Sequence, residues 1–221
     1  MSNPDGSSGP VHDAQAESTM TAQKPSNWNV PNALTTLRIL MVPFFAWALL
    51  LDDGESAVWR WVAFGLFALA MITDKIDGDL ARKHNLITNF GKIADPIADK
   101  ALTGMAFVGL SIIGELWWWV TVVVLVREWG ITLMRFWLIR HGVVMPAGRG
   151  GKLKTVVQTL SLALLVIPLR MFTGPWEVVG LVVWWVAAIG MGIAVALTVL
   201  TGLDYVRETI VARRAQVASH R

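Results

Sequence analysis

The stretch from residue 73 to residue 100, TDKIDGDLARKHNLITNFGKIADPIADK, holds two pairs of aspartates at helical spacing. Asp74 and Asp77 are three residues apart, and Asp95 and Asp99 are four apart. On helices, these spacings place both members of a pair on one face. Two neighbouring antiparallel helices could therefore bring four carboxylates together, and these would repel one another unless cations lay among them.

Such a cluster predicts a divalent metal site. The chain has no cysteine, and hard oxygen ligands without cysteine or suitably spaced histidine favour Mg²⁺ or Mn²⁺ over zinc. Two such ions can stabilise both the attacking and the leaving oxygen of a displacement at phosphorus. A solvated acidic loop at a helix end would explain any one of these aspartates, but not the repeated spacing.

Three residues beside the aspartates suit a phosphate ligand. Gly78 and Gly91 lack side chains, which lets a bulky ligand or a neighbouring helix approach closely. Arg82, one turn after Gly78, can offer a fork of donors to a diphosphate. Pro96 lacks an N–H, which is harmless in a first helical turn, so the helix carrying the second aspartate pair is predicted to begin just before it.

The elements that must position these residues are membrane-spanning helices. Hydrophobic residues make up 54% of the 221 residues, and a span needs about 20 apolar residues. Six stretches qualify: 33–51, 57–76, 94–114, 117–139, 153–172 and 178–202. Arg38 lies within the first and Arg127, Glu128 and Arg135 within the fourth, and such buried charges usually face a bundle interior or a wet cavity. We therefore predict an all-α, polytopic membrane protein with a six-helix bundle.

The charges of the connections predict the orientation. Residues 52–56 and 114–117 hold no Lys or Arg, whereas residues 75–92 and 140–154 and the C-terminal tail hold several. Positive residues favour the cytoplasmic side, so the termini and the aspartates are expected there, in the cell membrane. A net charge of +3 is too mild to indicate a nucleic-acid partner.

Three regions are expected. Residues 1–29 are rich in Ser, Gly, Pro and Gln and are predicted to be a disordered cytoplasmic tail. Residues 30–203 form the membrane domain. Residues 204–221 are a basic tail, either a short amphipathic helix on the membrane surface or a frayed end.

The acidic stretch resembles a known family signature. The pattern D-x-x-D-G-x-x-A-R, eight residues, then G-x-x-x-D-x-x-x-D is typical of the CDP-alcohol phosphatidyltransferase family. It is carried by Asp74, Asp77, Gly78, Ala81, Arg82, Gly91, Asp95 and Asp99. The segments NVPNALTTLRI, REWGITLMRFW and GGKLKT further resemble the bacterial subgroup that makes phosphatidylglycerol phosphate.

The resemblance implies an activity and a donor site. Members of this family move a phosphatidyl group from CDP-diacylglycerol to an alcohol, release CMP, and form homodimers. By the resemblance, two Mg²⁺ ions would be held by Asp74, Asp77, Asp95 and Asp99, with Asp99 also the general base. The donor would contact Gly78, Ala81 and Arg82, with Thr88, Asn32 and Thr35 as weaker additions. For Asn32, capping of the first span is the simpler expectation.

A second polar set bears on the acceptor. Arg127, Arg135, Lys152 and Lys154 lie in or near the cytoplasmic half of the fourth and fifth spans, and such a cluster suits an acceptor with a phosphate. The subgroup resemblance selects sn-glycerol 3-phosphate, with inositol phosphate or phosphatidylglycerol (cardiolipin synthesis) as alternatives. A Mg²⁺-dependent membrane prenyltransferase and a cation transporter are more remote hypotheses.

Overall fold

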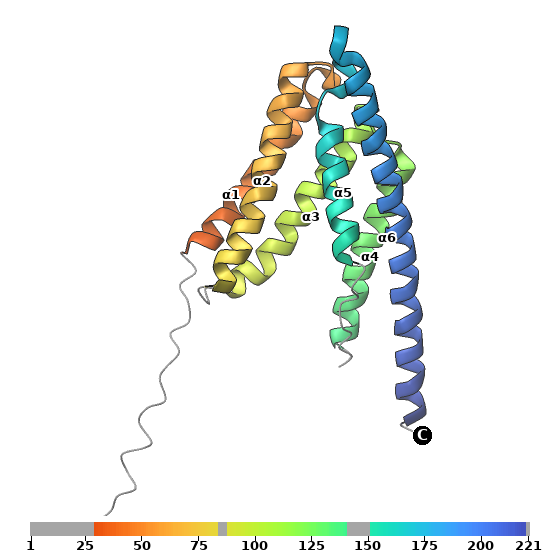
Figure 1. The fold of residues 1–221 in the computed structure, drawn as a ribbon. Helices are drawn as coiled ribbons and strands as arrows, with labels where there is room; N and C mark the ends of the chain where they lie inside the picture. Colours follow the sequence, from red (N-terminus) through yellow and green to blue (C-terminus); the bar gives the residue numbers. More distant parts are fainter. Residues whose placement is uncertain (1–28, 84–87, 141–150, 220–221) are drawn as a thin grey trace, which may run out of the picture.

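The computed structural model describes residues 29–83, 88–140 and 151–219, and all of its long elements are helices (Figure 1). They are α1 (Val30–Leu50), α2 (Ala57–Lys83), α3 (Asn89–Ile112), α4 (Trp118–Arg140), α5 (Gly151–Val166) and α6 (Glu177–Ser219), with short 3₁₀ turns η1 (Leu51–Gly54), η2 (Leu169–Met171) and η3 (Gly174–Trp176). No strand occurs among the described residues. The predicted all-α six-helix fold is confirmed.

The helices pack as two groups. α1 lies against α2 and α3, while α6 lies against α4 and α5, and α3 contacts both α4 and α5. Figure 1 shows the two groups close together at the end that holds η1 and spreading apart toward the other end. Buried apolar side chains from all six helices join the two groups, and the largest of them include Phe45, Phe67, Leu102, Phe107, Leu162 and Met191.

The outer surface of the bundle suits lipid. Large apolar side chains are exposed on all six helices, a surface that is rare on soluble monomers. Among the described residues, four segments are long and apolar enough to cross a membrane: Val30–Gly54, Ala57–Leu80, Leu153–Met171 and Gly174–Thr209. The predicted spans 94–114 and 117–139 are not among them, because α3 and α4 carry the charged residues of the site described below.

Two helix starts differ from expectation. The side chain of Asn29, rather than Asn32, caps α1 by accepting a hydrogen bond of 2.9 Å from the Asn32 amide. Likewise α3 begins at Asn89, because the Thr88 hydroxyl accepts a 3.0 Å hydrogen bond from the Gly91 amide. Pro96 therefore lies inside α3 rather than at its start, where it removes one hydrogen bond of the helix.

The last helix is longer than any span requires. α6 has 43 residues, or about 65 Å at 1.5 Å per residue, against about 30 Å of hydrocarbon. The boundary expected at residue 203 falls inside it, so the C-terminal tail continues the last span as far as Ser219 instead of forming a separate helix. The predicted tail 1–29, apart from Asn29, lies outside the described residues.

Candidate active site

An arginine from α1 links the first pair of aspartates. The Arg38 side chain is 1% exposed, and its two terminal nitrogens donate to different carboxylates. One donates to Asp74, and the other donates to Asp77 Oδ2 at 2.5 Å. The three-residue spacing thus turns both aspartates of α2 toward α1. Asp77 is buried with the arginine, whereas Asp74 is partly exposed.

The second pair is positioned from the same helix. Thr35, one turn before Arg38, donates a hydrogen bond of 2.5 Å to Asp95 Oδ1 on α3. Its hydroxyl is also 3.1 Å from the carbonyl oxygen of Pro31, which fixes the side chain against its own helix. α1 therefore contacts the carboxylates of both neighbouring helices.

Close approach of α1 and α3 explains the glycine in the motif. The Thr88 hydroxyl donates to Asn32 Oδ1 at 3.0 Å while it caps α3. A Cβ atom added at Gly91 would lie 3.0 Å from Asn32 Oδ1, 3.4 Å from Thr88 Oγ1 and 3.7 Å from Asp95 Oδ2. Any larger residue at Gly91 would push Asn32 or Asp95 out of place.

The four carboxylates are near enough to interact. Asp77 experiences the charges of Asp74 and Asp95, and Asp99 experiences those of Asp74 and Arg38. Their oxygens are the kind of ligand that Mg²⁺ accepts, so the donor set fits a divalent ion in chemistry. Within the described ranges, no group of three or more acidic or histidine side chains is close enough to hold one ion, and Arg38 engages two of the four aspartates.

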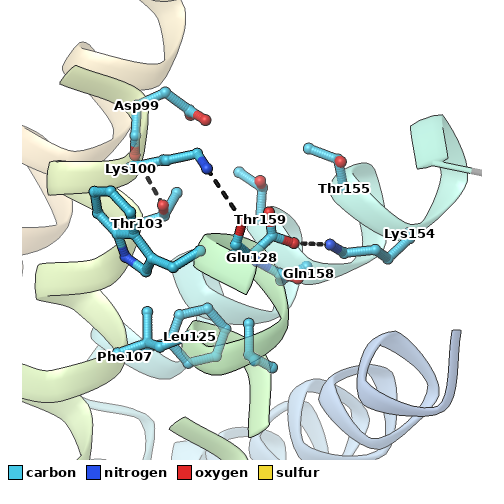
Figure 2. A pocket seen from close by; sticks show the side chains of 12 residues that line it. Asp99, Lys100, Thr103, Phe107, Leu125, Glu128, Lys154, Thr155, Gln158 and Thr159 are labelled. Atoms are coloured by element: carbon cyan, nitrogen blue, oxygen red, sulfur yellow. Dashed lines mark hydrogen bonds and ion pairs between the residues drawn. The ribbon is translucent and has the colours of Figure 1, made fainter. Parts of the chain in front are cut away.

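Asp99 also lines a pocket between α3, α4 and α5 (Figure 2). Lys154 of α5 enters this pocket and forms an ion pair with Glu128 of α4. Lys100 reaches α4 from the opposite side and donates to the Glu128 carbonyl oxygen at 3.2 Å and to the Thr132 hydroxyl. The pocket thus combines one carboxylate of the acidic cluster with two lysines.

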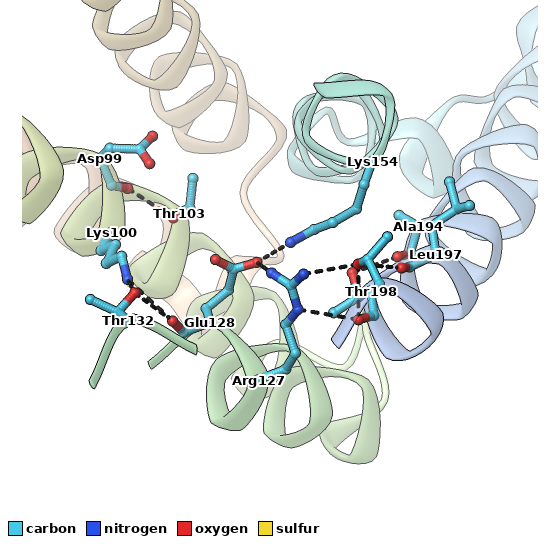
Figure 3. A network of polar contacts seen from close by, with 11 residues as sticks. Asp99, Lys100, Thr103, Arg127, Glu128, Thr132, Lys154, Ala194, Leu197 and Thr198 are labelled. Carbon is cyan, nitrogen blue, oxygen red and sulfur yellow. Dashed lines mark hydrogen bonds and ion pairs between the residues drawn. The ribbon is translucent and has the colours of Figure 1, made fainter. Parts of the chain in front are cut away.

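Arg127 and Arg135, both predicted to bind the acceptor, do not line this pocket. Arg127 ties α4 to α6: Nε donates to the Thr198 carbonyl oxygen at 3.2 Å, and one terminal nitrogen donates to Thr201 Oγ1 at 2.8 Å (Figure 3). Its other terminal nitrogen is 3.2 Å from Glu128 Oε1. Arg135 lies over the ring of Tyr205, 5.9 Å from its centroid.

The remaining predicted residues lie at helix ends. Gly78, Ala81 and Arg82 belong to the last turns of α2, and Lys152 to the first turn of α5. The side chains of Ala81, Arg82 and Lys152 lie outside the described residues.

The polar pocket residues that were not singled out from the sequence include Lys100, Gln158 and Thr103. Lys100 follows the last aspartate of the motif directly, and Gln158 is a polar residue within an otherwise apolar span. These two features of the sequence could have indicated that Lys100 and Gln158 belong to a functional site. Thr103 gave none, because an isolated threonine is common in helices of this kind.

Acidic side chains thus gather at helix ends of a bundle whose outer surface is apolar. The family model for CDP-alcohol phosphatidyltransferase matches residues 28–207. The chain belongs to this family and is a transferase.

The chain is also similar to individual proteins of this family. The chain is 47% identical over 197 residues to a protein of Mycobacterium tuberculosis (strain ATCC 25618 / H37Rv) named "Probable phosphatidylglycerophosphate synthase", with 89% of each chain covered. The chain is also similar to a protein of Rickettsia typhi (strain ATCC VR-144 / Wilmington) named CDP-diacylglycerol–glycerol-3-phosphate 3-phosphatidyltransferase. The two are 35% identical over 80% of this chain and 94% of the relative. Another protein of that name, from Bacillus subtilis (strain 168), is 34% identical over 80% of this chain and 93% of the relative.

Proposed function

We propose that this protein transfers the phosphatidyl group of CDP-diacylglycerol to sn-glycerol 3-phosphate, giving phosphatidylglycerol phosphate and CMP. The names of the relatives support this donor and acceptor. The observation that carries the proposal is the place of Asp99, which lies one turn after Asp95 on α3 and lines the pocket that Lys154 enters. One carboxylate therefore lies between a region suited to the donor diphosphate and a region suited to an anionic acceptor.

The step is a displacement at phosphorus. A hydroxyl oxygen of glycerol 3-phosphate forms a bond to the phosphatidyl phosphorus, the bond from that phosphorus to the CMP oxygen breaks, and CMP leaves with the electron pair. Asp99 accepts the hydroxyl proton, and a positioned carboxylate of this kind contributes roughly 10²–10⁴-fold to the rate. Lys154 and Lys100 provide positive charge for the phosphate of the acceptor.

Divalent metal belongs to the family's chemistry, and we propose Mg²⁺, with Mn²⁺ as a substitute. Asp74, Asp77, Asp95 and Asp99 would hold two ions. When bound, the ions would neutralise the diphosphate and the negative charge that develops on the leaving CMP. Arg38 would have to release its carboxylates, at least in part, for these ligands to be available. Gly78, Ala81, Arg82, Thr88, Asn32 and Thr35 remain the candidates for contact with the rest of the donor.

The site is proposed to face the cytoplasm from the cell membrane, with both chain ends on the same side. This placement follows from the distribution of Lys and Arg among the connections. It suits the chemistry, because the acyl chains of the donor stay in the bilayer while a water-soluble acceptor enters from the cytoplasm. A homodimer is proposed from the family resemblance alone, and cross-linking in the membrane tests it.

Release of CMP by the purified protein in lipid nanodiscs tests the function. The assay supplies CDP-diacylglycerol with glycerol 3-phosphate, inositol phosphate, serine or phosphatidylglycerol in separate reactions. We expect turnover with glycerol 3-phosphate, loss of turnover in EDTA, and recovery on addition of Mg²⁺. Turnover that is fastest with inositol phosphate or phosphatidylglycerol would reassign the acceptor, and no CMP release with any alcohol would overturn the proposal.

A further inference from the structure

Gln158 lines the pocket of Asp99 and carries a buried side-chain oxygen without a hydrogen-bond partner. The residue lies on α5, is 7% exposed, and is one of the residues that line the pocket. Its Oε1 atom is buried and has no hydrogen-bond partner. Such an atom is unfavourable in a folded protein unless a ligand or a water satisfies it.

Gln158 shares a helix face with a charged pocket residue. It follows Lys154 by four residues, so both side chains project from the same side of α5. Asp99 lines the same pocket from α3, and Figure 2 shows Glu128 of α4 between Asp99 and Lys154. The pocket therefore offers a proton acceptor, a neutral hydrogen-bond acceptor and a cation.

We propose that Gln158 determines acceptor specificity by accepting a hydrogen bond from the second hydroxyl of glycerol 3-phosphate, the one that does not react. This inference rests on the proposed function. An amide oxygen can only accept, so its partner must be a donor. The phosphate of the ligand has no proton to give near neutral pH and belongs with Lys154, and the reacting hydroxyl gives its proton to Asp99. The remaining donor is the hydroxyl on the middle carbon.

Asp99, Gln158 and Lys154, three of the polar residues that line the pocket, then each have one polar group of the acceptor as a partner. A site that pairs with a substrate hydroxyl discriminates against an analogue that lacks it, because the protein group is left buried and unpaired. The analogue in this case is 3-hydroxypropyl phosphate, which keeps the reacting hydroxyl and the phosphate but has no hydroxyl on the middle carbon.

The test compares kcat/KM for glycerol 3-phosphate and 3-hydroxypropyl phosphate in the wild-type protein and in Gln158→Leu. We expect the wild-type protein to prefer glycerol 3-phosphate by about tenfold or more. In Gln158→Leu the preference should fall to about two-fold or less, mainly through slower use of glycerol 3-phosphate. An unchanged preference in the variant would overturn the inference.

Two further variants control for indirect effects. Ser161→Ala alters a buried polar residue of the same helix that does not line the pocket, and it should keep the wild-type preference. Gln158→Glu retains an accepting oxygen, so it should keep more of the preference than Gln158→Leu does. Leucine is close to glutamine in size and Oε1 gives up no hydrogen bond, so we expect Gln158→Leu to fold.

The outcome separates the two proposals. Equal use of both acceptors by the wild-type protein contradicts only the role of Gln158, whether or not any variant folds. Failure of the wild-type protein to use glycerol 3-phosphate at all contradicts the proposed function and the inference together.

Discussion

Asp99 differs from the other three aspartates in what surrounds it. Asp77 and Asp95 are each bound by a side chain from α1, through Arg38 and Thr35 respectively, and Asp74 shares the same arginine. Asp99 instead faces the pocket between α3, α4 and α5. A carboxylate that must collect a proton from an entering alcohol needs access of this kind.

Replacing Asp99 with asparagine should therefore reduce chemistry more than folding. We expect Asp99→Asn to lower kcat roughly 10²–10⁴-fold, measured as CMP release at saturating glycerol 3-phosphate. Asp53→Asn is the matched control, because Asp53 is exposed in the turn η1 at the closed end of the bundle. Wild-type turnover in Asp99→Asn would remove Asp99 as the base.

Arg38 is predicted to hold the acidic cluster together when metal is absent. Removal of one partner from a buried ion pair typically costs about 3–5 kcal/mol. Arg38→Met should accordingly lower the free energy of unfolding by that order, measured in EDTA by denaturation in mixed micelles.

Mg²⁺ should reduce the difference in the free energy of unfolding between the wild-type protein and Arg38→Met, because the ion supplies the positive charge that the variant lacks. Arg38→Lys, which keeps a charge but not the two-pronged geometry, should fall between the wild-type protein and Arg38→Met. Equal stability of all three proteins in EDTA would show that the arginine is not needed to balance the carboxylates.

The sequence predicted the aspartates better than their partners. Spacing along one helix identified Asp74, Asp77, Asp95 and Asp99, because a shared face depends only on the period of that helix. Arg38 was identified as a buried charge near the donor site, but its partners could not be predicted because they are 36 and 39 residues away. The pocket residues depend on how α3, α4 and α5 meet, which no local pattern records.

The first half of α1 acts as the support of the site. Asn32, Thr35 and Arg38 are spaced three residues apart and project toward the starts and ends of the neighbouring helices. The sequence predicted that this segment lies near the donor site. It did not predict that its side chains would position the aspartates and the cap of α3.

Gly91→Ala tests how closely α1 and α3 must approach. The added methyl group would lie 3.0 Å from Asn32 Oδ1, so a shift of the helix or of Asn32 is required. Overpacking of this kind costs about 1–3 kcal/mol, and we expect kcat/KM for CDP-diacylglycerol to fall at least about tenfold.

Gly65→Ala is the control for this substitution. No atom lies within 4 Å of a Cβ at Gly65, and the same substitution in a helix interior otherwise stabilises by about 0.5–1 kcal/mol. Full activity and normal stability in Gly91→Ala would show that the interface tolerates a side chain.

The six helices were predictable because each contains a mainly apolar run, although α3 and α4 also carry the charged residues of the site. The ends of the helices were not predictable in this way. The start of α3 depends on the hydroxyl of Thr88, and the sequence offered Pro96 as the more prominent signal. The continuation of α6 beyond residue 203 was also missed, because polar residues alone do not stop a helix and residues 204–219 contain no Gly or Pro to break it.

The end of the bundle away from the aspartates is closed by another buried arginine. Arg60 of α2 is 1% exposed and donates to three carbonyl oxygens at the C-terminal end of α5, those of Leu165, Val166 and Ile167, at 2.7, 2.8 and 3.2 Å. It also forms a 3.2 Å ion pair with Glu115, which follows α3. Segments far apart in the sequence are thereby joined.

Arg60→Met should destabilise the whole bundle by about 3–5 kcal/mol, because Glu115 and the carbonyl oxygens lose a buried partner. Unfolding in mixed micelles measures this. Arg170→Met is the control, since Arg170 is exposed and its nitrogen is 4.0 Å from Glu115, a contact worth about 0–1 kcal/mol. A similar loss of stability in both variants would show that the buried contacts of Arg60 do not stabilise the bundle.

The length of α6 has a practical consequence. A 43-residue helix is about 35 Å longer than the hydrocarbon layer is thick, so part of it extends beyond the bilayer core. A fluorophore or an affinity tag joined to its C-terminal end would be separated from the core of the bundle by several helical turns, which suits this helix for immobilising the protein on a sensor surface.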